Sequence, residues 1–416
     1  MDFGIQGDNE TMYNEINELQ EGSVTSPKGY KSGVTYAGLR AYSPDKRDLG
    51  ILYSEKQATV AGVFTTNLVR SHSVTLSEKH INSGYAQAII VNSGVANACV
   101  GMQGLKDAEE MASSIASKFV IPFEDVLVCS TGMIGVELPM GLIRGGIEKL
   151  NLENNFGHEF ARAILTTDKT TKEIAVSFKF EGQVVTIGGC AKGSGMIHPN
   201  MATMLAFITT DAKVSFGNLQ AALKQISDST FNMISVDGDT STNDTVLMLS
   251  NGASLTSEIL PDMLEWDVFL TALHKVCEYL AKSIARDGEG ASKLIEVIVN
   301  EAATLNDARL IARSISSSLL VKTAVYGNDP NWGRIMMAVG KSGAEVNESN
   351  ISLFLNEICI MEGGLPIPYY KEALIGEMRS SDVSIRVHLG LGDFRAVAWG
   401  CDMSEEYVTF NSAYTT

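Results

Sequence analysis

The stretch Lys192-Gly-Ser-Gly-Met-Ile-His-Pro-Asn-Met-Ala-Thr-Met-Leu205 decides how this chain folds, because it joins two halves of an alternating pattern of strands and helices. It opens with a turn, in which Gly193 and Gly195 can reach backbone conformations that other residues avoid and Pro199 imposes a bend. The apolar run that follows predicts a strand beginning at Ala202-Thr203. Such a junction can hold a peptide bond in a strained geometry. The sequence therefore predicts that the chain is cut here.

Thr203 is the candidate nucleophile for this cut. If its hydroxyl attacked the carbonyl carbon of Ala202, the peptide bond would become an ester, and hydrolysis would leave Thr203 with a free α-amine beside its own hydroxyl. An α-amine titrates at about 8, so it can accept the hydroxyl proton near neutral pH. A Thr that opens a strand is usually only a strand former, so this interpretation depends on the surrounding sequence.

Blocks on both sides of the junction resemble the self-cleaving ornithine acetyltransferases of arginine biosynthesis, also called glutamate N-acetyltransferases. The resemblance runs from about Pro27 to Thr416, and the common order and spacing of the blocks make it highly specific. Besides the junction, the blocks are Asn92–Cys99, Ser130–Gly135, Thr166–Asp168, Asp237–Thr245, Arg286–Gly290, Asn328–Gly333 and Asn411–Thr416.

The resemblance gives Thr131 and Gly132 the role of an oxyanion-stabilising pair. Taken alone, Ser130-Thr-Gly132 predicts only a turn after a strand, with backbone N–H groups and one hydroxyl free to point outward. In the resembled family these groups hold the negative oxygen of a tetrahedral intermediate. Losing such a donor typically slows a reaction by about 100- to 1000-fold.

The resemblance also implies a pocket with opposite charges, since ornithine and glutamate share an α-carboxylate but differ at the far end. Lys192 is expected to pair with a carboxylate and Glu289 with an ammonium group. The sequence leaves open whether Thr166 or Thr167 makes the hydrogen bond, and the C-terminus, which would ordinarily fray, is expected to enter the site. The expected substrate-binding residues are Thr166, Thr167, Lys192, Thr203, Glu289, Asn411 and Thr416.

Two glycine-rich segments are not read as nucleotide-binding loops. A phosphate loop places its Lys after the second Gly and before a helix, whereas Lys192 precedes Gly193 and a strand is expected next. The segment Gly288-Glu-Gly290 lacks the third glycine of a dinucleotide fingerprint and follows its helix instead of preceding it.

Other polar residues near the junction are read as structural. His198 lies beside Pro199 and is interpreted as a loop residue, because the freed amine already supplies a base. The spacing of Asp237, Asp239 and Asp244 does not match a calcium loop, so a polar turn is expected there.

Composition narrows the function classes. The net charge of −17 argues against a nucleic-acid partner. No run of about 18 or more apolar residues and no signal-peptide pattern is present, so we expect no membrane partner and a cytoplasmic location. The six cysteines form no C-x-x-C pair and are expected to be free thiols. No metal and no cofactor are expected.

The expected fold class is α/β (α+β), with layered sheets, flanking helices and a resemblance to the DmpA-like aminopeptidase fold. Residues 1–24 are expected to be a flexible acidic leader, residues 25–202 the α chain after cleavage, and residues 203–416 the β chain. A boundary between two lobes is expected near the cut.

Local patterns place several elements. Glu173–Ile187 alternates around a turn and predicts a hairpin, and the apolar spacing in Asp262–Ala285 predicts a long helix. Strands are also expected at 58–64, 88–91 and 125–129, and helices at 105–119 and 140–150.

The resemblance implies an acetyltransferase that moves the acetyl group of N2-acetyl-L-ornithine to L-glutamate through an acetyl-Thr203 ester. The sequence does not decide whether acetyl-coenzyme A also serves as a donor. The resemblance implies a heterotetramer of two α and two β chains. The alternatives are a self-processing amidase or aminopeptidase, in which water resolves the acyl-enzyme, and an inactive binding relative that stays uncut.

Overall fold

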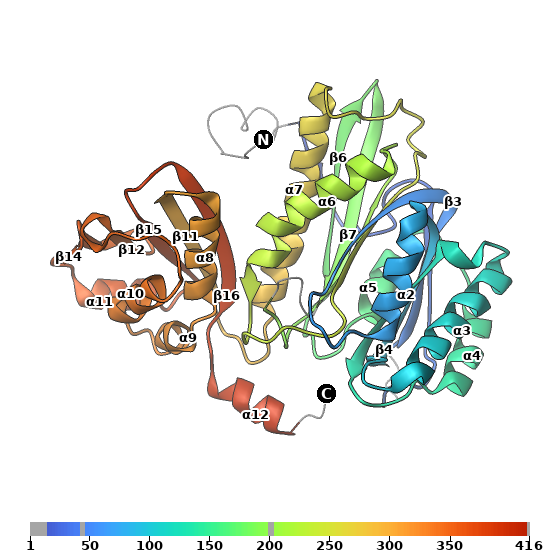
Figure 1. The fold of residues 1–416 in the computed structure, drawn as a ribbon, viewed down its shortest axis with the longest axis horizontal. Helices are drawn as coiled ribbons and strands as arrows, with labels where there is room; N and C mark the ends of the chain where they lie inside the picture. Colours follow the sequence, from blue (N-terminus) through green and yellow to red (C-terminus); the bar gives the residue numbers. More distant parts are fainter. Residues whose placement is uncertain (1–14, 42–45, 199–203, 414–416) are drawn as a thin grey trace.

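A computed structural model describes residues 15–41, 46–198 and 204–413 of the chain. Two β-sheets and their flanking helices make up this part of the molecule, and Figure 1 shows two of the helices, α6 (Phe216–Ser229) and α7 (Leu264–Arg286), standing between the sheets. The expected α/β class with layered sheets and flanking helices is confirmed.

The larger sheet contains nine strands within the described residues, in the order β1-β6-β7-β8-β10-β3-β4-β5, with β2 paired to β3. Neighbours are antiparallel except for β8 with β10 and β4 with β5, which are parallel. The strands are β1 (Asn17–Glu18), β2 (Tyr30–Thr35), β3 (Leu49–Phe64), β4 (Tyr85–Val95), β5 (Val126–Met133), β6 (Lys172–Phe180), β7 (Gln183–Lys192), β8 (Leu205–Thr210) and β10 (Thr245–Ser250).

The smaller sheet has the order β14-β13-β12-β15-β11-β16-β9 in the described part of the chain. Helix α8 packs on its central strands, and α12 follows its last strand in the sequence. The strands are β9 (Ile234–Ser235), β11 (Leu294–Ala302), β12 (Ser352–Leu355), β13 (Ile358–Glu362), β14 (Leu365–Pro366), β15 (Asp382–His388) and β16 (Phe394–Cys401). Its helices are α8 (Leu305–Ser316), α9 (Leu319–Tyr326), α10 (Trp332–Gly340), α11 (Lys371–Glu377) and α12 (Glu405–Ala413).

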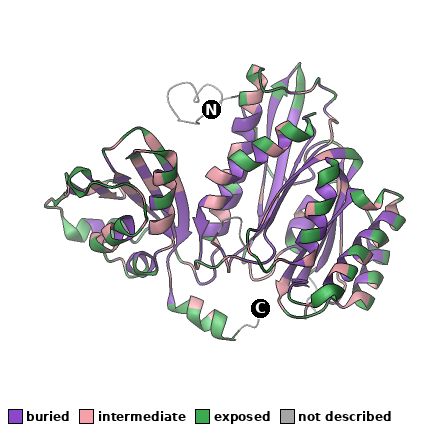
Figure 2. Ribbon diagram, viewed as in Figure 1, coloured by how far each residue is buried: buried purple, intermediate pink, exposed green. Residues whose placement is uncertain are grey.

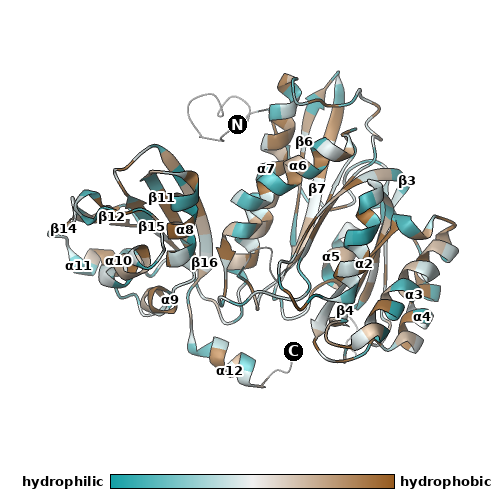
Figure 3. Ribbon diagram, viewed as in Figure 1, coloured by the Kyte–Doolittle hydropathy of each residue, from teal (hydrophilic) through white to brown (hydrophobic). Residues whose placement is uncertain are grey.

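Helices cover both faces of the larger sheet. The helix α7, expected from its apolar spacing, packs on β6 and β7, while α5 packs behind the sheet with Phe160 against Phe207 of β8. The remaining helices at the β4–β5 end are α2 (His72–His80), α3 (Gly101–Phe119) and α4 (Met140–Lys149), and α5 spans Gly157–Ala163. Figure 2 shows the central strands of the larger sheet mostly buried and the outward helix faces exposed, and Figure 3 shows hydrophobic residues on these strands and on one side of α7.

Strand β8 begins with four apolar residues, Leu205–Ile208, because both of its faces are covered. All six of its residues are buried, and alternate residues contribute to the cores on opposite faces of the sheet, as Phe207 and Ile208 do. A central strand with both faces covered shows no polar alternation. The hairpin is confirmed as β6–β7, and the other expected strands and helices are confirmed within β3, β4, β5, α3 and α4.

Two expectations about organisation are wrong. Residues 1–14 of the expected flexible leader lie outside the described residues, but Asn17 and Glu18 form β1 and pair with β6, and Ile16 and Val24 are buried. The lobes do not divide at the junction either. Strands β8 and β10, which follow Thr203 in the sequence, lie in the middle of the larger sheet, because β8 completes the sheet beside β7.

No helix in the described ranges is both long enough and apolar enough to span a membrane. Within those ranges all six cysteines are free, and Cys129, Cys190, Cys277 and Cys401 are buried.

Candidate active site

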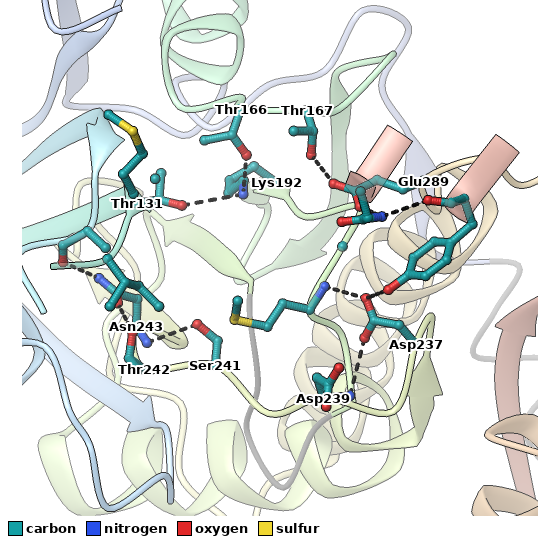
Figure 4. A pocket seen from close by; sticks show the side chains of 18 residues that line it. Thr131, Thr166, Thr167, Lys192, Asp237, Asp239, Ser241, Thr242, Asn243 and Glu289 are labelled. Carbon is teal, nitrogen blue, oxygen red and sulfur yellow. Dashed lines mark hydrogen bonds between the residues drawn. The ribbon is translucent and has the colours of Figure 1, made fainter. Parts of the chain in front are cut away.

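A cavity of about 160 Å³ lies where β5 and β7 end, beside the segment that precedes β10 (Figure 4). It brings together every expected oxyanion or substrate residue within the described part of the chain. The lining residues are Ala96, Thr131, Gly132, Met133, Ile134, Thr166, Thr167, Lys192, Gly195, Met196, Asp237, Asp239, Ser241, Thr242, Asn243, Glu289, Tyr407 and Asn411.

Lys192 supplies the positive charge of the cavity. It is the last residue of β7 and is only 3% exposed. Its Nζ donates hydrogen bonds to Oγ1 of Thr166 at 2.7 Å and to Oγ1 of Thr131 at 3.4 Å, as drawn in Figure 4. Burial lowers the pKa of Lys192, while the nearby carboxylate of Asp168 raises it. The ammonium group therefore depends on its anionic neighbours to remain charged.

Glu289 supplies a negative charge to the same cavity. It lies in the loop between α7 and β11, and its carboxylate accepts hydrogen bonds from Oγ1 of Thr167 at 2.7 Å and from Nδ2 of Asn411 at 3.0 Å. Its backbone N–H donates to the carbonyl oxygen of Ser194 at 2.7 Å. Thr166 is thus hydrogen-bonded to the positive Lys192, and Thr167 to the negative Glu289.

Thr131 and Gly132 form one wall of the cavity at the end of β5. Gly132 pairs with Gly94 of the parallel strand β4, and a Cβ atom at position 132 would be 2.2 Å from the carbonyl carbon of Gly94. With a φ of +131°, Gly132 also has a backbone conformation that other residues rarely adopt. Only glycine fits at this position, and Thr131 places its hydroxyl within reach of Lys192.

Asn243 holds this wall in place, although it was not among the residues expected in the site. Its Nδ2 donates to the carbonyl oxygens of Ala96 at 2.6 Å and Ser130 at 2.7 Å. The Ser130 hydroxyl in turn donates to Oδ1 of Asn92 at 2.6 Å. These buried hydrogen bonds join the ends of β4 and β5 to the start of β10. The available sequence signal was that Asn92, Ser130 and Asn243 each lie in one of the blocks that resemble the family.

Asp237 anchors the turn opposite. Its carboxylate accepts the backbone N–H groups of Met196 at 2.5 Å, Ile197 at 2.9 Å and Asp239 at 3.2 Å. Burial raises the pKa of Asp237, while these hydrogen bonds lower it. Such a pattern is that of a polar structural turn, as expected from the sequence.

The C-terminal helix α12 reaches the cavity through Tyr407 and Asn411. The Tyr407 hydroxyl lies 3.4 Å from Oδ2 of Asp237, and Ser404 donates to the carbonyl oxygen of Gly290 at 2.6 Å. A Cβ atom on Gly290 would be 2.4 Å from the backbone nitrogen of Tyr407. The close approach at Gly290 therefore fixes where the helix starts. Tyr407 was not anticipated, because no local pattern marks it.

His198 lies outside the cavity lining. Its Nδ1 is 3.1 Å from the Ser235 hydroxyl and its Nε2 is 3.4 Å from a guanidinium nitrogen of Arg313. Burial, followed by the charges of Arg313 and Lys322, lowers its pKa from 6.5 to about 4. This placement supports its interpretation as a structural residue.

Ala202, Thr203 and Thr416 lie outside the described residues. The chain resumes at Met204, whose backbone N–H donates to Oδ1 of the buried Asp244 at 2.6 Å. Leu205 then pairs with Lys192 of β7 and with Thr245 of β10. Position 203 therefore lies two residues before the register partner of Lys192.

Comparison with known proteins gives a consistent family. The ArgJ family model matches residues 31–416. An arginine biosynthesis bifunctional protein ArgJ from Dehalococcoides mccartyi is 50% identical over 405 residues, covering 97% of this chain and 100% of that protein. One from a strain of Bacillus cereus is 48% identical over 404 residues, covering 96% and 98%. A crystal structure of the Bacillus halodurans protein of that name aligns with a TM-score of 0.49 at 45% identity, covering 50% of this chain and 98% of that one.

Proposed function

Because this chain belongs to the ArgJ family, we propose that it is an acetyltransferase of arginine biosynthesis, which moves the acetyl group of N2-acetyl-L-ornithine to L-glutamate. The single observation that carries the proposal is one cavity with the ammonium group of Lys192 and the carboxylate of Glu289 in its walls. This arrangement suits an amino acid with a carboxylate at one end and an ammonium group at the other.

The proposed nucleophile is Thr203, freed by cleavage of the bond that follows Ala202. Its α-amine would take the hydroxyl proton while Oγ1 attacks the acetyl carbonyl carbon of N2-acetylornithine. The new carbon–oxygen bond forms, the carbon–nitrogen bond breaks, and the proton passes to the departing amine of ornithine. This leaves an acetyl ester on Thr203. Two positions further along the sequence, Leu205 pairs with Lys192, which lines the cavity, and this supports the assignment.

In the second half, the α-amine of glutamate attacks the ester carbonyl, and Thr203 recovers its hydroxyl proton. The Thr131 hydroxyl and the Gly132 N–H would stabilise the negative oxygen of both tetrahedral intermediates. We assign Lys192, with Thr166, to the substrate carboxylate, and Glu289, with Thr167 and Asn411, to the ammonium group of ornithine. Thr416 would complete the site from the C-terminus.

Intact-mass and turnover measurements test the proposal together. Denaturing mass spectrometry should give two species that sum to 44.7 kDa plus one water, with a new N-terminus at Thr203. Incubation with N2-acetylornithine and glutamate should give ornithine and N-acetylglutamate, and native mass spectrometry should give two α and two β chains. Acetate released without glutamate would instead indicate a hydrolase. An uncut, inactive chain would indicate a binding relative. Replacing N2-acetylornithine with acetyl-coenzyme A in the same assay shows whether it is a second donor.

A further inference from the structure

A buried group of alternating charges lies behind the cavity wall and is made by Asp168, Lys172 and Asp287. Nζ of Lys172 lies 2.8 Å from Oδ1 of Asp168 and 2.6 Å from Oδ2 of Asp287. The side chains of Asp168, Lys172 and Asp287 are 0%, 1% and 7% exposed, and none of the three lines the cavity. These residues are therefore placed to act on the cavity only through others.

The network ties together the segments that carry the recognition residues. Asp168 accepts hydrogen bonds from the backbone N–H groups of Thr166 at 3.1 Å and of Gly193 at 2.6 Å. It therefore holds both Thr166, which accepts a hydrogen bond from Lys192, and the residue that follows Lys192 in the sequence. Asp287 accepts those of Lys169 at 3.1 Å and Thr170 at 3.3 Å, and it lies two residues before Glu289. Lys172, through Asp168 and Asp287, thus connects the loop of Thr166 and Thr167, the end of β7 and the loop of Glu289.

The same network controls the charge of Lys192. Burial alone would raise the pKa of Asp168, but Lys192 and Lys172 hold it well below its usual range, so Asp168 stays ionised. Oδ2 of Asp168 lies 3.9 Å from Nζ of Lys192. The charged groups that act on Lys192 are Asp168, Lys172, Glu289 and Asp244.

We propose that Asp168 and Lys172 are positioning residues for substrate recognition. Asp168 keeps Lys192 charged and directed into the cavity. Lys172, through Asp287, sets where Glu289 lies relative to Lys192. This inference rests on the proposed function, because it assigns Lys192 and Glu289 to the two ends of the substrate.

The first test is Asp168→Asn, which removes the charge with little change of shape. The KM for both N2-acetylornithine and glutamate should rise by about 10- to 100-fold, the factor expected when a charge-assisted hydrogen bond is lost, while kcat changes less. Without Asp168, the pKa of Lys192 falls further. The KM should therefore begin to rise at a lower pH than in the wild type. Asp228→Asn, which breaks the exposed Lys224–Asp228 pair, is the matched control and should leave both KM values unchanged.

The second test is Asp287→Asn, which leaves Asp168 and both lysines in place and so remains informative if Asp168→Asn does not fold. It should raise the KM for N2-acetylornithine more than that for glutamate, because only the first presents an ammonium group to Glu289. Calorimetric measurement of ornithine affinity in the variant and the wild type should show the same weakening of binding without turnover. If both variants fold and differ from the wild type only in a lower Tm, with unchanged KM values and an unchanged pH dependence of KM, the inference is overturned. Failure of the proposed function would appear separately, as no acetyl transfer by the wild type.

Discussion

Gly195 lies directly against the carboxylate of Glu289: a Cβ atom at position 195 would be 2.4 Å from Cδ and Oε2 of Glu289. The segment that leads into the proposed cleavage site and the proposed ammonium-binding residue therefore share one tightly packed contact. Since Thr167 and Asn411 already hold that carboxylate, it has little room to shift.

Gly195→Ala should weaken recognition of the ammonium group. Overpacking of this kind costs about 1–3 kcal/mol, and here we expect it to appear as an increase of about 10-fold or more in the KM for N2-acetylornithine. Gly217→Ala is the control, because a Cβ atom there meets nothing within 4 Å. Equal KM values in the two variants would show that Glu289 moves freely.

Thr203→Ala should abolish both cleavage and transfer, because the same hydroxyl would serve in each. Denaturing mass spectrometry should then show one full-length chain of about 44.7 kDa. Thr203→Ser, which keeps a hydroxyl, is the control and should still yield two chains. Persistent cleavage in the alanine variant would mean that the nucleophile is another residue.

Lys192→Met and Glu289→Gln should separate the two ends of the substrate. Lys192→Met keeps much of the side-chain volume but removes the charge that both substrates need, so the KM for each should rise by about 100-fold or more. Glu289→Gln should affect N2-acetylornithine far more than glutamate. Steady-state kinetics with each substrate varied in turn measures both effects, and a uniform loss of kcat alone would contradict these roles.

Gly132→Ala should damage both stability and catalysis. The added methyl group would meet the backbone of Gly94, which is not a flexible side chain, and the φ of +131° would be strained. We expect the free energy of unfolding to fall by about 1–3 kcal/mol and kcat to fall by about 100-fold or more. In Gly141→Ala the new Cβ meets nothing within 4 Å, so thermal unfolding and kcat should stay near the wild type.

His198→Gln should make stability less sensitive to acid. The pKa of His198 is lowered from 6.5 to about 4, so the unfolded chain binds this proton more readily than the folded chain does. The free energy of unfolding therefore falls as the pH decreases from about 6.5 to about 4. Urea titrations across this interval should show a smaller decrease for the variant. Parallel curves for the two proteins would mean that His198 is not buried as described.

Local sequence patterns predicted much of the secondary structure. The three- and four-residue spacing of Asp262–Ala285 became α7, and the alternation of Glu173–Ile187 became the β6–β7 hairpin. Such periodicities reflect which side of an element is buried, so they can be read without the partner element. Every site residue that the family-like blocks suggested, and that the structure describes, also lines the cavity.

Other features depended on contacts between distant positions. Ile16 and Val24 are buried, although the many acidic residues around them indicated a flexible leader. The place of β8 between β7 and β10 removed the expected lobe boundary, because hydrogen bonding between strands is not encoded in either strand alone.

The sequence by itself determined the α/β class, the main helices and strands, and the family with its expected recognition residues. Only the tertiary structure decided that Lys172 joins Asp168 to Asp287, 115 positions further along the chain from the lysine, and that Asn243 holds the ends of β4 and β5. The physical reason is that the residue types of a buried charge or amide show that it needs partners, whereas the folding of distant segments against each other determines which partners it finds.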